Sequence, residues 1–401
     1  MPASGAPTAT PSLYVFYTEG GERLYRYDAQ TGERVLIIKA CFDGDLRVDA
    51  AHRLLFWSCS SAGEIRALAL APRGGLAAAQ ASGESDPSRD DLSASVRAGE
   101  AGVMGLALDA KARYVYFVNE KTGVLARCKY GAAAMALLDA ERRGVDDDSG
   151  GDDDDDFGGS SSQSGDSGED ADDEADEAEL IEDFGGSVAP FGLDVDVGRR
   201  EYVATARDKD GMGYVVRGPL EARGAPGARS RRVQLLYVTS AADVPVHGVQ
   251  YHAATRTVYW LEDRGVANGV YARRLPRDAD ADDADGAADD GADDDAGAVL
   301  SADDNACGAH ADDDNVDDAA ACGAQFVQLL DESYWIAAAW DLPTPALFAT
   351  DATHGSVFHF AFTGATSLAD NGGVSLANET ATRDPRCIGY YYGDKLVDGF
   401  E

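Results

Sequence analysis

Two adjoining short strands recur along the chain. The first strand is apolar and ends in a polar residue, and the second is rich in aromatic residues. The last residue of the second strand lies eight positions after the last residue of the first. Five copies keep this offset, and their first strands lie at 46–49, 106–109, 193–196, 249–252 and 338–341. A fixed internal unit of this kind predicts a repeat protein built from antiparallel strands.

A sixth copy, at residues 15–18, has only its second strand. The six second strands end at Tyr17, Trp57, Phe117, Ala204, Trp260 and Ala349. Once two acidic stretches, 146–183 and 278–318, are removed, successive ends are 40 to 60 residues apart. That period suits a four-stranded propeller blade, so the sequence predicts an all-β, six-bladed β-propeller.

The remaining strands complete the blades. Third strands are predicted at 23–28, 64–70, 124–129, 213–217, 269–274 and 356–360. Outer strands are predicted at 34–40, 135–141, 232–239 and 325–330, whereas the Gly/Ala/Ser-rich residues 71–100 are interpreted as a loop. Residues 1–11 are predicted to be a flexible N-terminus that supplies no innermost strand. The apolar run 387–392 is therefore predicted to close the ring as the innermost strand of the first blade. Residues 12–401 would then form one propeller.

Charge is concentrated in two places. The net charge is −38, and the stretches 146–183 and 278–318 hold 36 of the 72 acidic residues and neither Lys nor Arg. The rest of the chain is close to neutral. Few apolar residues and a high net charge predict two disordered insertions. Such polyanions bind divalent cations weakly and suit a basic protein partner, for which Phe157, Leu180, Ile181 and Phe184 are candidate apolar anchors. We expect neither a nucleic acid nor a membrane as partner.

Two segments carry a family resemblance. Residues 105–130, GLALDAKARYVYFVNEKTGVLARCKY, and 247–274, HGVQYHAATRTVYWLEDRGVANGVYARR, resemble the YWTD repeats of LDL-receptor class B propellers. The related NHL and SMP-30/gluconolactonase families share much of this pattern. The resemblance to the SMP-30/gluconolactonase family implies an alternative function. The chain would then be a metal-dependent hydrolase that binds its metal through Glu, Asn and Asp at the channel mouth. Glu19 and Asn119 are the candidates for such a set.

The innermost strands of a propeller line its central channel. Their middle residues are predicted to be Arg47, Ala107, Asp194, Gln250 and Ala339. Arg47, Asp194 and Gln250, with His247 at the channel mouth, are the candidate channel residues. Either they form a ligand site, or the channel holds only water. The polar strand ends Asp49, Asp109, Asp196, His252 and Asp341 could ligate a metal, but their repetition in every blade favours turn residues.

No catalytic motif accompanies the repeats. The sequence contains no Gly-x-Ser-x-Gly elbow, phosphate-binding Gly loop, His-Glu-x-x-His or Cys-x-x-Cys motif. We therefore predict a non-catalytic scaffold for protein interactions that requires no cofactor. The hydrolase above and an acidic, chaperone-like binder of basic proteins are the alternatives. Six widely spaced cysteines suggest free thiols, and no signal peptide or membrane span is evident, which predicts an intracellular, cytoplasmic location.

Overall fold

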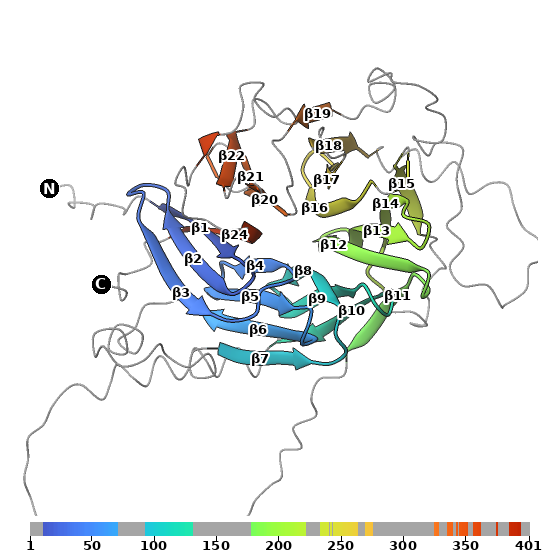
Figure 1. Cartoon of the computed structure of the whole chain (residues 1–401), viewed down its shortest axis with the longest axis horizontal. Helices are drawn as coiled ribbons and strands as arrows, with labels where there is room; N and C mark the ends of the chain where they lie inside the picture. Colours follow the sequence, from blue (N-terminus) through green and yellow to red (C-terminus); the bar gives the residue numbers. More distant parts are fainter. Residues whose placement is uncertain are drawn as a thin grey trace, which may run out of the picture.

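Six four-stranded antiparallel sheets surround a common centre (Figure 1). The computed structural model describes residues 11–70, 93–130, 178–221, 233–239, 241–242, 244–263, 269–275, 325–328, 335–339, 342–343, 345–351, 356–361, 374–375 and 385–393. These residues form strands and turns and include no helix. The chain is thus an all-β, six-bladed β-propeller, as its repeats predict.

Each blade runs from an innermost strand at the channel to an outer strand at the rim. Blades 1 to 3 consist of β24 (Pro385–Gly393), β1 (Ser12–Glu19), β2 (Arg23–Asp28), β3 (Arg34–Lys39); β4 (Leu46–Asp49), β5 (Leu54–Cys59), β6 (Glu64–Ala69), β7 (Ser93–Ala98); and β8 (Val103–Asp109), β9 (Tyr114–Asn119), β10 (Val124–Lys129), β11 (Glu179–Asp183). Blades 4 to 6 consist of β12 (Val188–Asp196), β13 (Glu201–Asp208), β14 (Gly213–Pro219), β15 (Gln234–Val238); β16 (Val246–His252), β17 (Thr257–Glu262), β18 (Gly269–Arg274), β19 (Gln325–Gln328); and β20 (Ile336–Ala339), β21 (Ala346–Asp351), β22 (Ser356–Ala361), β23 (Val374–Ser375).

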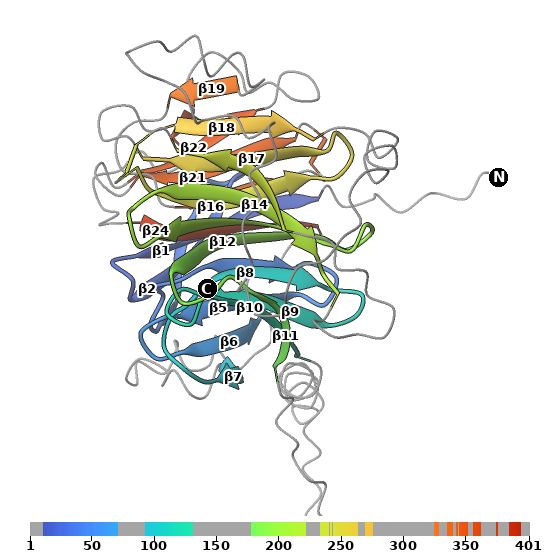
Figure 2. The same cartoon turned by 90° about the vertical axis from the view of Figure 1, so that its right-hand side faces the viewer.

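Closure of the ring joins the two ends of the chain. Strand β24 pairs with β1, with Gly389 opposite Phe16. Ile388 is fully buried in this seam, and Thr18 Oγ1 accepts a hydrogen bond of 3.0 Å from the Cys387 N–H. The prediction of terminal-strand closure is confirmed. Strands β24 and β1 lie side by side in both views (Figure 1 and Figure 2). Because their seam joins the two ends of the chain, its loss would open the whole ring.

The polar residues at the ends of the innermost strands are turn residues. The carboxylates of Asp49, Asp109 and Asp196 accept backbone N–H bonds of 2.9 to 3.1 Å from the residue three positions later. Each turn then ends on an arginine with positive φ: Arg53, Arg113, Arg200 and, after His252, Arg256. This is the Asx-turn chemistry expected of a repeated structural residue. Asp341 lies outside the described residues. We call the side of the propeller that carries these turns the turn face.

The predicted register of blade 6 is wrong. Ile336 pairs with Ala349 and Ala339 with Ala346, so six residues separate the two strands, whereas four separate Asp49 from its partner Leu54. The innermost strand therefore lies two residues earlier than its repeat spacing predicts, and Ala337 takes the channel position assigned to Ala339. A run of Ile and Ala has no polar residue to distinguish one register from another.

Two outer strands also differ from the prediction. Strand β7 lies within residues 71–100, which were interpreted as loop, and β11 takes the outer position of blade 3 assigned to residues 135–141. The insertion predicted at 146–183 overlaps strand β11, so its predicted C-terminal boundary is wrong. Ile181 and Phe184 are packed in the core and cannot serve as anchors for a partner. Outer strands have one solvated face, so acidic residues can alternate with buried ones.

Both acidic stretches occupy the same kind of connection. Residues 146–177 lie between β10 and β11, and residues 278–318 between β18 and β19. Strands β10 and β18 end beside the starts of β9 and β17, as Lys129 pairs with Tyr114 and Arg274 with Thr257. Both connections therefore leave from the turn face. An outer strand at 135–141 predicts that the first stretch follows that strand and leaves from the opposite face, and this prediction is wrong. The conformation of these stretches lies outside the described residues.

The prediction of free thiols is wrong for one pair of cysteines. Cys41, in the link between β3 and β4, is joined by a disulfide to Cys59 at the end of β5, and their Cα atoms are 5.4 Å apart. Cys128 and Cys387 are buried and form no disulfide, whereas Cys307 and Cys322 lie outside the described residues. Sequence spacing does not reveal the pair because the link folds back over the end of β5. In the described part of the chain, no helix has the length and apolarity needed to cross a membrane.

Glycines allow the innermost strands to approach one another closely. A Cβ on Gly105 would lie 2.4 Å from the Phe191 carbonyl oxygen and 2.8 Å from the Leu193 nitrogen, both in the neighbouring blade. We expect Gly105→Ala to lower the free energy of unfolding by about 1–3 kcal/mol, because the clash is with backbone. Gly186→Ala is the matched control, since its Cβ meets nothing within 4 Å. It should be neutral or stabilising by up to about 1 kcal/mol in the same denaturant titration. Equal effects of the two substitutions would contradict the close approach.

Candidate functional site

A cavity of about 290 Å³ occupies the centre of the ring, where the six innermost strands converge (Figure 1). Each blade contributes one residue at the middle of its innermost strand: Gly389, Arg47, Ala107, Asp194, Gln250 and Ala337. The space exists because three of these positions are small. The cavity wall also includes the exposed Ala50 in the first turn, so the cavity opens at the turn face.

Arg47 crosses the channel on the side away from the turn face. Its Nε donates a hydrogen bond of 2.7 Å to the Leu106 carbonyl, and its Nη2 donates one of 2.9 Å to the Leu193 carbonyl. Nη2 also lies 3.1 Å from a carboxylate oxygen of Asp45. One side chain of blade 2 therefore binds blades 3 and 4, with the small Ala107 leaving room for it to pass.

Asp194 and Gln250 continue the same arrangement around the ring. Asp194 Oδ2 accepts a 2.7 Å hydrogen bond from the Tyr251 N–H of blade 5. Gln250 donates through Nε2 to the Ile336 carbonyl and accepts through Oε1 from the Ala338 N–H of blade 6, both at 3.2 Å. The predicted channel residues thus bind the backbone of the next innermost strand, which has no sheet partner on that side.

Asp45 belongs to this network, although the sequence did not single it out. It stands one residue before Leu46, at the position that Gly105, Gly192 and Gly248 occupy in other blades. Its carboxylate is almost fully buried and accepts a 2.9 Å bond from the Leu106 N–H. A buried acid in place of a repeated glycine is a sequence signal that could have revealed it.

Burial controls the charge of the two channel carboxyls. It raises the pKa of Asp45 and of Asp194, while the Arg47 guanidinium and backbone N–H donors act in the opposite direction. A buried ion pair of this kind contributes little net stability, but removing one partner leaves an uncompensated charge. The network therefore requires all of its members.

His247 is not part of the cavity wall. It lies near the other end of the channel, with its ring centre 6.5 Å from that of Phe191, over which Arg207 packs at 5.7 Å. Burial lowers the pKa of His247 to about 4, with Asp263 opposing the shift and Arg207 adding to it. The imidazole is therefore neutral at physiological pH. Burial also raises the pKa of Glu120 nearby.

The candidates for a hydrolase metal set have structural partners. Asn119 Oδ1 accepts the Lys121 and Thr122 N–H groups of a turn at 2.9 and 3.1 Å. Its amide nitrogen donates to the carbonyls of Glu100 and Ala101. Glu19 pairs with Arg34 at 3.1 Å. The structure brings together Arg47, Asp194 and Gln250 in the channel, and it leaves Asn119 and Glu19 as turn and blade contacts.

Comparison with known proteins identifies the fold. No family model matches the chain, and no curated protein matches it in sequence. A chain in the crystal structure of a nidogen/laminin complex has a TM-score of 0.54 at 10% identity, covering 94% of this chain and 98% of that chain. A putative 6-phosphogluconolactonase from Bacteroides fragilis has a TM-score of 0.44 at 10% identity, covering 96% and 99%. A gluconolactonase from Xanthomonas campestris has a TM-score of 0.44 at 11% identity, covering 95% and 86%.

The first of these similarities agrees with the resemblance to YWTD repeats. At such low identity it shows the fold alone, because one propeller architecture serves unrelated functions. The chain is a six-bladed propeller with YWTD-like repeats, and its function has to be argued from its own residues.

Proposed function

We propose that the chain is a non-catalytic propeller scaffold that binds basic protein partners through its two acidic stretches. The observation that carries this proposal is their common position. Both interrupt the connection between third and outer strands, in blades 3 and 5, and both leave from the turn face. Residues 146–177 and 278–318 hold 16 and 17 acidic residues and no Lys or Arg. The two connections that leave from this face therefore hold 33 of the 72 acidic residues.

The channel supports the scaffold part of the proposal. Arg47, Asp194 and Gln250 all hydrogen-bond backbone groups of neighbouring blades. Side chains used in this way stabilise a rigid ring. A rigid ring holds the starting points of the two acidic stretches at fixed positions, which allows both to engage one partner.

The negative charge of the two stretches determines which kind of partner they attract. A concentrated negative field accelerates association with cationic surfaces and becomes weaker as salt screens it. Leu180 remains a candidate apolar contact, because its side chain is 40% exposed at the edge of blade 3. Weak binding of divalent cations by the same stretches stays a prediction. An intracellular location also stays a prediction. The Cys41–Cys59 disulfide removes one argument for it, which was the expectation of free thiols.

Deletion of residues 146–177 and 278–318 tests the proposal while keeping β11 and β19. We expect the intact chain to bind a lysine-rich peptide and to lose most of that affinity between about 0.05 and 0.5 M NaCl. The doubly deleted chain should bind at least about tenfold more weakly. A chain of full length with these Asp and Glu residues changed to Asn and Gln separates charge from length. Equal binding by intact and neutralised chains would disprove the proposal.

A further inference from the structure

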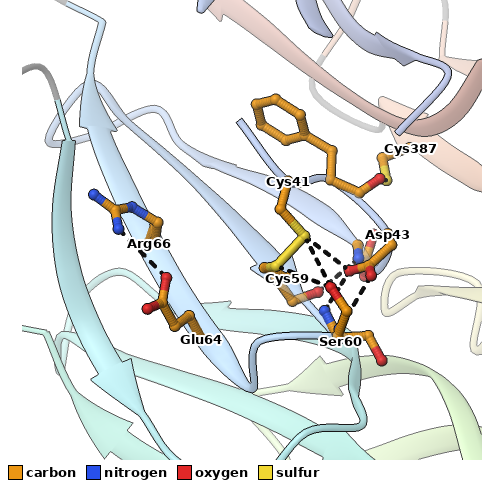
Figure 3. Close-up of a disulfide and its surroundings, with 11 residues drawn as sticks. Cys41, Asp43, Cys59, Ser60, Glu64, Arg66 and Cys387 are labelled. Carbon is orange, nitrogen blue, oxygen red and sulfur yellow. Dashed lines mark hydrogen bonds and ion pairs between the residues drawn. A yellow bond between two sulfur atoms is a disulfide. The ribbon is translucent and has the colours of Figure 1, made fainter. Parts of the chain in front are cut away.

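The disulfide lies in a cluster of groups that could ligate a metal. Figure 3 shows Cys41 and Cys59 with the Asp43 carboxylate directed toward them. The two sulfur atoms and a carboxylate oxygen all lie within 4.8 Å of one another. Asp43 comes from the link before β4 and Cys59 from the end of β5, so the fold rather than local sequence brings them together.

Asp43 is held firmly in this position. Its two carboxylate oxygens accept hydrogen bonds from the Ser60 and Ser61 N–H groups, the second at 3.0 Å. Oδ1 also lies 3.4 Å from the Cys41 sulfur. A disulfide sulfur has no hydrogen to donate, so in the oxidised protein this contact satisfies neither group. After reduction, rotation of the two side chains separates the sulfurs, and the two thiolates and the carboxylate then supply three anionic ligands.

The link that carries Cys41 and Asp43 is fixed by contacts other than the disulfide. The Phe42 N–H donates to the Gly21 carbonyl at 2.8 Å, and the Phe42 ring packs 5.3 Å from that of Trp57. The Cys387 thiol of β24 donates to the Gly44 carbonyl at 3.0 Å. Reduction of the disulfide would therefore leave the backbone that carries Cys41 and Asp43 close to its present position.

We propose that Cys41, Cys59 and Asp43 bind a zinc-like divalent cation when the disulfide is reduced. A dithiol reductant gives the disulfide two electrons and two protons and itself becomes a disulfide. A phosphine gives two electrons and becomes a phosphine oxide, with the oxygen atom and the two thiol protons supplied by water. The cation then displaces the two thiol protons. Two thiolates and one carboxylate suit Zn²⁺ or Cd²⁺, and a water or the Ser61 hydroxyl would take the fourth position. Ser61 Oγ lies 3.4 and 3.5 Å from the two sulfurs.

Solvent can reach the proposed metal site, and a metal there would have a structural role. Cys41 and Asp43 are half-buried and Ser61 is exposed, so a cation can enter from solvent. The link between blades 1 and 2 would be fastened in either environment, by a disulfide under oxidising conditions and by a metal under reducing ones. This inference is independent of the proposed binding of basic partners.

The test uses the full-length chain with Cys307 and Cys322 changed to serine, because those two thiols lie in the second acidic stretch. After reduction with a phosphine and its removal without air, we expect Cd²⁺ to produce a saturable thiolate-to-metal ultraviolet band at one equivalent. Carboxylates give no such band, so the acidic stretches do not contribute to it. Zn²⁺ should compete for the site. The oxidised chain should show no band.

Substitutions test which side chains bind the metal. Cys41→Ser should abolish the band, and Asp43→Asn should weaken Cd²⁺ binding about tenfold or more, since a direct ligand costs at least as much as an outer-shell one. Cys128→Ser is the matched control, because this thiol is buried and forms no disulfide, and the variant should keep the band. Circular dichroism checks that every variant is folded. No band in the reduced chain, an unchanged band in Cys41→Ser, or an unchanged affinity for Cd²⁺ in Asp43→Asn would overturn the proposal.

Discussion

A chain that ends at Asp384 is expected to unfold or aggregate. It lacks β24, whose Ile388 and Tyr391 are 0% and 3% exposed in the seam with β1. Burial of each large apolar side chain contributes about 1.5–3 kcal/mol, and domains are stable by only about 5–15 kcal/mol in total. The truncation also leaves the apolar strand β1 with an unpaired edge, which promotes association between chains.

Light scattering and thermal unfolding of the truncated chain measure this effect. Removal of residues 1–10 is the matched control, since β1 begins at Ser12 and stays whole. The control should remain monomeric with the melting temperature of the full chain. If the chain ending at Asp384 were monomeric with an unchanged melting temperature, β24 would not be what closes the ring.

Replacement of Arg47 by methionine is expected to cost about 3–5 kcal/mol at neutral pH, because it leaves the buried Asp45 and the half-buried Asp194 without their cation. It also removes the hydrogen bonds to Leu106 and Leu193. Arg23→Met is the matched control, since Arg23 is 50% exposed and lies 3.9 Å from Glu19. The control should change the free energy of unfolding by less than about 1 kcal/mol.

The effect of Arg47→Met should depend on pH. Burial raises the pKa of Asp45 and Asp194 above 3.8, so the folded chain holds protons that the unfolded chain has released. Stability from these groups is then highest below pH 3.8 and falls as pH rises through their folded pKa. Loss of Arg47 raises both pKa values further. Denaturant titrations should therefore show a smaller difference between variant and wild type at mildly acidic pH than at neutral pH.

Much of the fold could be predicted because each repeat carries its own register marks. An acidic residue at the end of the innermost strand and aromatic residues in the second strand placed β4, β5, β8 and β9 correctly. The closing strand β24 was predictable for a different reason. An apolar run remained after blade 6 was complete, and blade 1 lacked an innermost strand.

The errors share a physical cause, which is the absence of such marks. The Ile and Ala residues of β20 fit several registers, and the acidic outer strand β11 resembles the polyanion that precedes it. The channel residues could be placed but not interpreted from sequence. Whether Arg47 binds a ligand or a backbone carbonyl depends on the small size of Ala107 beside it and on Asp45, whose role becomes visible only when the blades meet.

The coupling between Arg47 and Asp45 measures most directly whether the polar channel residues hold the ring together. A double-mutant cycle needs the unfolding free energies of wild type, Arg47→Met, Asp45→Asn and the double variant. Because the two side chains lie 3.1 Å apart and both bind blade 3, we expect a coupling energy of about 1–3 kcal/mol. Effects that add to within about 0.5 kcal/mol would show that the two residues act independently and that the channel network does not stabilise the propeller.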